Sequence, residues 1–95
     1  MKRPCVYLLA NHYKGTLHTG VTSNLPQRTW QHKTEAVDGF AAKYGLKMLV
    51  RYEEQESMEH AIECEKWLKK LSRSRKFWLI EPVNPEWKDL AETLE

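Results

Sequence analysis

Glu65 is the side chain whose position points most directly to chemistry. Residues 57–72 form a predicted helix, and at about 100° per residue Glu65 falls in the middle of its apolar stripe. A carboxylate among apolar side chains is costly unless a cation or a metal ion pairs with it. Two interpretations stay open: Glu65 is a metal ligand or catalytic carboxylate in a cleft, or it lies at the edge of the stripe or pairs with a core arginine. The other stripe residues are Met58, Ala61, Ile62, Leu68 and Ser72.

A run of cations follows Glu65. Residues 66–76 hold six Lys or Arg and no Asp or Glu. Such a run is usually a solvated helix face, but clustered cations are also typical of proteins that contact the phosphate backbone of nucleic acids. The residues that we assign to nucleic-acid binding are Lys66, Lys69, Lys70, Arg73 and Lys76.

Three predicted strands provide the framework for these residues. Residues 4–10 are apolar, aromatic and β-branched, and residues 16–22 alternate so that His18, Gly20 and Thr22 share one face. The polar, glycine-containing turn between them indicates an antiparallel hairpin. Residues 47–52 have the composition of a third strand, which Glu53 and Glu54 are expected to end.

Helices fill the rest of the chain. A short helix is predicted from Leu25 to about Lys33, with Ser23 or Asn24 as its cap, and it places Arg28 and His32 on one face because they are four residues apart. Residues 34–45 form a connection with a helical stretch around residues 40–44, and residues 73–80 add a further helical turn or two. Together these elements predict an α+β fold with a small three-stranded antiparallel sheet flanked by helices.

Length and composition limit the class of protein. The 95 residues suffice for one domain, assigned to residues 1–95, and 41% hydrophobic with 29% charged residues excludes a disordered chain. The longest apolar run, residues 6–10, is too short for a membrane span or a signal peptide, so we expect a soluble, cytoplasmic protein without a membrane partner. Cys5 and Cys64 are too isolated for a disulfide scaffold or a zinc knuckle, and both are predicted to be small buried hydrophobes.

The net charge of +2 conceals an uneven distribution. Residues 1–51 hold eight Lys and Arg against two Asp and Glu, whereas residues 52–95 hold seven against eleven. The basic first half and the basic run in the second half can therefore flank one polyanion. Most of the four tryptophans, Trp30, Trp67, Trp78 and Trp87, are expected to pack rather than to stack on bases.

Two tripeptides and three later residues resemble the GIY-YIG nuclease superfamily. Val6-Tyr7-Leu8 is followed, eleven positions after Tyr7, by His18-Thr19-Gly20, and then by Arg28 with His32 and by Glu65 on a later helix. Other stretches also look like family segments, namely residues 20–32, 39–40, 43–45, 61–62 before 65–66, 84–87 and 89–90. The resemblance covers nearly the whole chain and is strongest to small single-domain bacterial endonucleases related to a catalytic domain of the excision-repair nuclease.

The resemblance implies a three-stranded antiparallel sheet flanked by helices and a divalent-metal-dependent hydrolysis of nucleic-acid phosphodiester bonds. It places Tyr7 at the first signature tyrosine, Arg28 at the catalytic arginine and His32 at the accompanying site histidine. Glu65 takes the place of the metal-binding glutamate, with Mg²⁺ or Mn²⁺ as the cofactor. The implied substrate is branched, nicked or single-stranded DNA in repair or recombination. The structural positions of the site are Gly20 and Asn84.

The residue types suit this chemistry, with one departure. The donor fork of Arg28 neutralises nonbridging phosphate oxygens, and Tyr7 is expected to orient or deprotonate the attacking water as a phenolate favoured by nearby positive charge. His18 stands where the family has tyrosine, and because histidine is a base near neutral pH we predict that it is catalytic. The alternatives are a catalytically weak or silent nucleic-acid-binding module and a protein-interaction domain whose basic helix binds an acidic partner.

Overall fold

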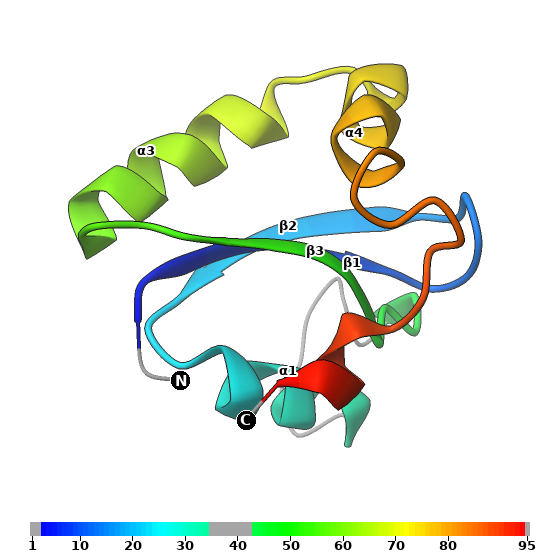
Figure 1. Cartoon of the computed structure of the whole chain (residues 1–95), viewed down its shortest axis with the longest axis horizontal. Coiled ribbons are helices and arrows are strands. Elements are labelled where there is room, and N and C mark those ends of the chain that lie inside the picture. Colours follow the sequence, from blue (N-terminus) through cyan, green and yellow to red (C-terminus); the bar gives the residue numbers. More distant parts are fainter. Residues whose placement is uncertain (1–2, 35–42, 95) are drawn as a thin grey trace.

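The computed structural model describes residues 3–34 and 43–94, and its elements follow the predicted order (Figure 1). The strands are β1 (Cys5–Ala10), β2 (Leu17–Thr22) and β3 (Met48–Glu54). The helices are α1 (Leu25–Lys33), α3 (Met58–Lys69) and α4 (Arg73–Ile80), followed by the 3-10 helix η1 (Leu90–Thr93). The helical stretch predicted around residues 40–44 falls mainly on residues 35–42, outside the described residues. Within the described ranges, no helix is long and apolar enough to cross a membrane.

β1 is the central strand of the sheet. It pairs antiparallel with β2 on one side and with β3 on the other, so that Tyr7 lies between Gly20 and Tyr52. All six side chains of β1 are buried, because neighbouring strands flank it and helices cover both of its faces. This arrangement explains the uninterrupted apolar run in the sequence and confirms the predicted α+β fold with a three-stranded antiparallel sheet.

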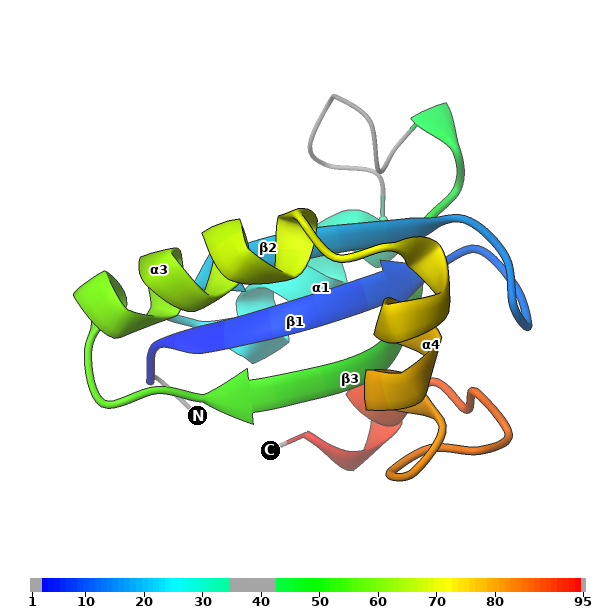
Figure 2. The same cartoon turned by 90° about the horizontal axis from the view of Figure 1, so that it is seen from above.

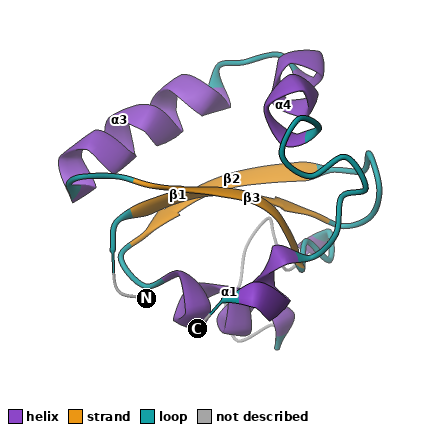
Figure 3. Ribbon diagram, viewed as in Figure 1, coloured by secondary structure: helices purple, strands orange, loops and turns teal. Residues whose placement is uncertain are grey.

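Helices cover both faces of the sheet (Figures 1 and 3). α1 and η1 lie against one face, and α3 and α4 lie over the other, as the view from above shows (Figure 2). Tyr7 and Leu9 pack with Leu25 of α1, whereas Val6 packs with Leu68 of α3. The alternation along β1 therefore directs Tyr7 to the α1 face.

The third strand is longer than predicted and does not end before the two glutamates. Glu53 and Glu54 pair with Val6 and Cys5 of β1. Because β3 is an edge strand, both carboxylates reach solvent, and Arg51 donates to Glu53 at 2.9 Å. Exposed charges on an edge strand also discourage pairing with other chains.

The predicted helix over residues 57–72 is divided differently in the structure. Ser57 lies outside α3 as its N-cap, accepting a hydrogen bond from the backbone N–H of His60 at 3.2 Å. α3 ends at Lys69, and Ser72 caps the next helix, α4, by accepting from the N–H of Arg75 at 3.3 Å. The same residue type thus marks the start of both helices.

The core-facing stripe of α3 is narrower than predicted. Ala61 and Leu68 are buried, but Met58, Ile62 and Ser72 are exposed. A helix that lies on a small sheet buries only the side that faces the strands, and α3 makes its main strand contacts with β2 and β1. Neighbours of Glu65 that we expected in the core are therefore at the surface.

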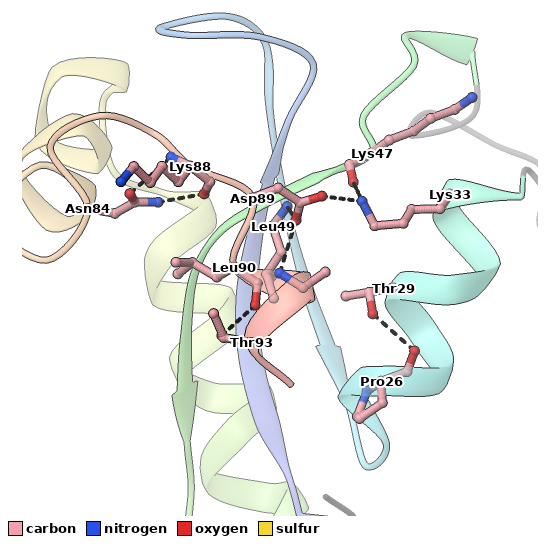
Figure 4. Close-up of polar contacts among 11 residues, drawn as sticks. Pro26, Thr29, Lys33, Lys47, Leu49, Asn84, Lys88, Asp89, Leu90 and Thr93 are labelled. Carbon is pink, nitrogen blue, oxygen red and sulfur yellow. Dashed lines mark hydrogen bonds and ion pairs between the residues drawn. The ribbon is translucent and has the colours of Figure 1, made fainter. Parts of the chain in front are cut away.

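The Asn84 side chain holds the loop after α4 on the sheet (Figure 4). The Asn84 amide donates to the carbonyls of Val50 and Lys88 at 3.0 and 2.8 Å and accepts from the Lys88 N–H at 3.0 Å. This loop brings Trp87 into the core, where it is 1% exposed and meets Phe77 edge to face at 4.9 Å.

Asp89 joins η1 to β3 and α1 (Figure 4). Its carboxylate accepts from the N–H groups of Leu49 and Ala91 at 3.1 and 3.0 Å and pairs with the ammonium of Lys33. Lys33 also donates to the Lys47 carbonyl at 3.2 Å. These contacts hold the C-terminal end of α1 against the sheet.

Candidate active site

Tyr7 and Gly20 are packed against each other on neighbouring strands. They are directly paired, and a Cβ atom on Gly20 would lie 2.4 Å from Cζ and 2.5 Å from the hydroxyl oxygen of Tyr7. The tyrosine ring therefore passes over the backbone of Gly20, from the central strand toward the outer edge of β2. Position 20 requires glycine because a Cβ atom there would meet the Tyr7 ring.

His32 meets the Tyr7 hydroxyl from α1. Asn24 caps this helix by accepting from the Gln27 N–H at 3.3 Å, and the helix then turns its buried face, with His32, toward the sheet. His32 Nε2 lies 3.4 Å from the Tyr7 hydroxyl oxygen. The other ring nitrogen, Nδ1, is buried without a hydrogen-bond partner among residues 3–34 and 43–94.

His18 lies beside His32, with 6.1 Å between the ring centroids. Burial lowers the pKa of His18, and the charges of Lys69, Arg28 and Lys76 lower it further, against an opposing effect of Glu65. Burial also lowers the pKa of His32, with smaller contributions from His18 and Arg28. Both imidazoles are therefore neutral at neutral pH and can accept a proton.

Tyr7 is not the phenolate that we predicted. Burial raises the pKa of its hydroxyl, and although Arg28 lowers it, Glu65 raises it again. Desolvation disfavours the charged form of a tyrosine more strongly here than the nearby arginine favours it. Tyr7 is a neutral phenol at neutral pH and can donate a hydrogen bond.

Arg28 and Glu65 bring the charges of the site to β2 from opposite faces of the sheet. In the part of the chain that the structure describes, the half-buried Arg28 guanidinium forms no hydrogen bond or ion pair, so its donors are available for a phosphate. The Glu65 side chain is 17% exposed, and Lys69 Nζ lies 3.5 Å from its Oε2. Both of these charges act on Tyr7 and His18.

The structure thus brings together five of the predicted site residues, together with Gly20, around the edge strand β2. They are Tyr7, His18, Arg28, His32 and Glu65. They come from β1, β2, α1 and α3, and the electrostatic effects described above connect each of them to another member of the set. Asn84 is placed differently, because its hydrogen bonds go to Val50 and Lys88 and hold the loop after α4.

The predicted nucleic-acid-binding cations divide into three groups. Lys69 and Lys76 lie close enough to His18 to lower its pKa, and burial together with Lys69 lowers the pKa of Lys76 itself. Lys66 on α3 and Lys70, the C-cap of α3, are exposed. Arg73 makes contacts within the fold. Its Nη2 donates to the carbonyls of Lys14 and Gly15, both at 2.6 Å, and its guanidinium lies over the Phe77 ring.

Comparison with protein-family models identifies the fold family. The model of the GIY-YIG catalytic domain matches residues 3–77. The chain belongs to the GIY-YIG family. Searches of curated proteins and of solved structures gave no match. Membership of the GIY-YIG family implies a nuclease that binds DNA.

GIY-YIG nucleases generally use divalent metal ions, and the donor set here fits an ion that shares its ligands with substrate. Across residues 3–34 and 43–94 there is no cluster of three or more His, Cys, Asp or Glu side chains that would enclose a metal. Glu65 instead offers one partly exposed carboxylate. Mg²⁺ is commonly held by one or two carboxylates, with waters and substrate phosphates as the other ligands.

Two contacts that hold the candidate site together were not predicted from the sequence. One is the Lys33 and Asp89 pair that holds α1, which carries Arg28 and His32, on the sheet. A usable signal was present, since Asp89 directly precedes a short helical segment and has the residue type of an N-cap. The contact of His32 with Tyr7 had no local signal, because 25 residues separate the two.

Proposed function

We propose that the chain is a divalent-metal-dependent endonuclease that hydrolyses phosphodiester bonds in DNA. The observation that carries this proposal is the grouping of an uncharged phenol and two neutral imidazoles with an available guanidinium and a partly exposed carboxylate at the edge of β2. The group contains a proton acceptor, a donor for phosphate oxygens and a cation ligand, which are the parts that phosphodiester hydrolysis requires.

His18 is the proposed general base. Its neutral imidazole takes a proton from water, the water oxygen forms a bond to phosphorus, the bond from phosphorus to the leaving oxygen breaks, and the leaving oxygen takes up a proton from solvent. Tyr7, whose hydroxyl stays protonated, orients the water or a phosphate oxygen by hydrogen bonding, and His32 holds the tyrosine hydroxyl. This assignment replaces the phenolate role that the sequence suggested for Tyr7.

Arg28 and Glu65 are the residues that stabilise the negative charge on the phosphate during the reaction, Arg28 directly and Glu65 through a bound cation. The planar guanidinium of Arg28 donates to two nonbridging oxygens and stabilises the charge that builds up on them. Glu65 would hold the divalent ion, either Mg²⁺ or Mn²⁺, which when bound would supply Lewis-acid stabilisation of the phosphoryl and leaving oxygens. Lys69 releases the carboxylate by moving its flexible ammonium toward a substrate phosphate.

The proposal also covers the kind of DNA that is cut and the cations that bind it. The DNA substrate is branched, nicked or single-stranded and is processed in repair or recombination in the cytoplasm, and residues 1–95 act as one domain. Lys66, Lys69, Lys70 and Lys76 contact the phosphate backbone, while Arg73 holds the turn between β1 and β2.

A matched pair of variants on α3 tests the proposal. Glu65→Gln removes the candidate metal ligand, and Glu63→Gln removes an exposed carboxylate two residues away on the same helix. We expect the purified protein to cut branched, nicked or single-stranded DNA with Mn²⁺ or Mg²⁺ and not with EDTA. Glu65→Gln should lower the rate at least 100-fold, and Glu63→Gln should match the unchanged chain. Equal activity of the two variants, or no cleavage by the unchanged chain, would contradict the proposal.

A catalytically weak or silent nucleic-acid-binding module is the second candidate. Two observations favour it: histidine replaces the second signature tyrosine, and Lys69 already lies 3.5 Å from the Glu65 carboxylate. This candidate predicts salt-sensitive DNA binding that falls when Lys69 and Lys70 are neutralised and that is unchanged by EDTA or by Glu65→Gln. Metal-dependent cleavage that is lost in Glu65→Gln would eliminate it.

A further inference from the structure

A second feature of the molecule lies outside the site, where α3 and α4 meet. The two helices line a cavity of about 560 Å³, which we call the α3–α4 groove. Its walls include Trp67 and Trp78, which are 56% and 78% exposed, and Leu71 and Leu79. Trp30 on α1 is also exposed, at 61%, whereas Trp87 is buried in the core.

The charge around the α3–α4 groove is positive. Arg75 lines it, and it lies within the run of six cations over residues 66–76 that contains no carboxylate. The nearest acidic residues along the exposed side of α3, Glu59 and Glu63, lie one or two turns toward its N-terminus. A ligand that combines flat apolar surfaces with negative charge is complementary to such a groove.

A band of lysines connects the α3–α4 groove with the active site. Measured around α3 from Glu65 at about 100° per residue, Lys69 lies at about 40°, Lys66 at about 100° and Lys70 at about 140°. Trp67 follows at about 200° on the far side of this band. The three lysines are exposed and lie at the C-terminal end of this surface, whereas Glu59 and Glu63 lie on the same side toward the N-terminus of α3, so the basic part of the surface is the part beside the groove.

We propose that the α3–α4 groove binds unpaired bases of a single-stranded DNA segment whose phosphates follow the lysine band to the site at Glu65. Aromatic platforms beside a positive track are the usual means of binding single strands without sequence preference. Duplex DNA does not fit this surface, because its bases are stacked inside the helix and offer no faces to Trp67 or Trp78. The inference rests on the proposed function, in that it takes DNA to be the ligand of the neighbouring site.

Binding of a fluorescein-labelled oligothymidylate tests the groove without metal and without cleavage. We measure fluorescence anisotropy at low salt for Trp67→Leu and Trp78→Leu, which keep an apolar side chain and remove the aromatic face. Trp30→Leu is the matched control, because Trp30 is 61% exposed on α1 at the opposite face of the sheet. Each groove variant should raise the Kd about tenfold, which corresponds to the loss of one stacked base, and the control should leave it unchanged.

A second measurement tests the contribution of the positively charged side chains to DNA binding. Arg75→Gln changes the groove without touching either tryptophan and should also weaken binding. Lys66→Gln and Lys70→Gln should each reduce the slope of log Kd against log salt by about 0.7, the value for one phosphate contact on a single strand. Affinity for a blunt duplex should be unaffected by Trp67→Leu.

The outcomes separate the inference from the proposed function. Unchanged oligothymidylate binding in both groove variants, or an equal loss in Trp30→Leu, overturns the inference even if the protein cuts DNA. Groove-dependent binding by a protein that never cleaves overturns the nuclease proposal and leaves the inference standing. If the unchanged chain is a dimer in analytical ultracentrifugation and Trp67→Leu is a monomer, the groove is an interface between copies of this chain, and the inference is overturned.

Discussion

At the scale of single residues, the spacing between Tyr7 and Gly20 decides whether the site can form. The tyrosine ring occupies the volume in which any other residue at position 20 would place its Cβ atom. The hydroxyl reaches His32 only because the ring can cross β2 at this point. Glycine usually weakens a strand. Gly20 therefore lowers the local stability of β2, but it leaves the space that the Tyr7 ring occupies.

Gly20→Ala should therefore destabilise the protein by about 1–3 kcal/mol, as other overpacked cores do. We expect the loss to appear in urea unfolding followed by circular dichroism. The control is the same substitution in a Tyr7→Leu background, where the smaller side chain leaves room for the new methyl group. Equal losses of stability in the two backgrounds would show that the contact with Tyr7 is not the cause.

His18 should set the acid limb of the pH–rate profile. Burial and the neighbouring cations lower its pKa from the ordinary value of 6.5, so its neutral, proton-accepting form is already present below that pH. We expect kcat/KM to rise with pH and to level off below pH 6.5. His18→Asn should lower kcat/KM by about 10²-fold or more, and His60→Asn, at an exposed position of α3, should leave it unchanged.

The family residue offers a further check on His18. His18→Tyr restores the second signature tyrosine, whose hydroxyl has a much higher ordinary pKa than an imidazole. If position 18 supplies the base, this variant should stay active and its acid limb should move to higher pH. An unchanged profile in His18→Tyr would mean that another group limits the rate.

At the scale of elements, α1 is held in place at two ends by different means. Its N-terminus has a local cap, Asn24, whereas its C-terminus depends on Lys33 and on Asp89, which are 56 residues apart in the chain. The helix carries Arg28 and His32, so the Asp89 contacts support the site from a distance. α4 also stabilises a neighbouring segment. Arg73, at the start of α4, donates hydrogen bonds to the loop between β1 and β2.

Asp89→Ala should lower the free energy of unfolding by about 1–3 kcal/mol, since two partly buried N–H groups and the Lys33 ammonium lose their partner. Hydrogen bonds from Lys33 and from two backbone N–H groups hold the pKa of Asp89 below its ordinary value despite its burial. Its stabilising effect is thus complete above the pKa of an unfolded aspartate, about 3.9, and is lost as the pH falls through the folded value.

Urea unfolding between pH 3 and pH 7 measures this effect. The unchanged chain should lose more stability on acidification than Asp89→Ala does, because the variant lacks the group that becomes protonated. Asp89→Asn is the control for charge, since its amide oxygen still accepts hydrogen bonds from backbone N–H groups. Parallel pH curves for the unchanged chain and Asp89→Ala would argue against the predicted linkage.

At the scale of the whole molecule, the core extends beyond the part that matches the family model. That match ends at residue 77, yet Ile80 and Trp87 pack with Leu8 and Val50 in one buried cluster. η1 packs on the opposite face, where Leu90 contacts the cluster that contains Tyr7. Residues 78–94 therefore complete both hydrophobic layers of the sheet.

Trp87→Ala should cost about 3–5 kcal/mol of stability, because it leaves a large cavity between α4 and the sheet. Trp78→Ala provides the matched control, since the same residue type is 78% exposed there and the change should stay within about 0.5 kcal/mol. Thermal unfolding of the two variants makes the comparison. A similar loss in both would indicate that the segment after α4 does not contribute to the core.

The order and type of the elements were determined by the sequence itself. Strand alternation, helix periodicity and capping residues act over a few positions, which is why the hairpin, α1 and the start of α3 agree with the prediction. Resemblance to the GIY-YIG family, and not periodicity, selected Tyr7, His18, Arg28, His32 and Glu65 as one set of residues.

Only the tertiary structure decided how these residues are placed and charged. Whether Tyr7 is a phenol or a phenolate depends on its burial, which comes from strands and helices distant in the chain. The exposure of Ile62 and Trp67, and the use of Arg73 to hold a turn, likewise depend on which side of each helix meets the sheet. Local patterns specify elements, but burial and long-range contacts arise only when the elements pack, and these set the chemistry of the site.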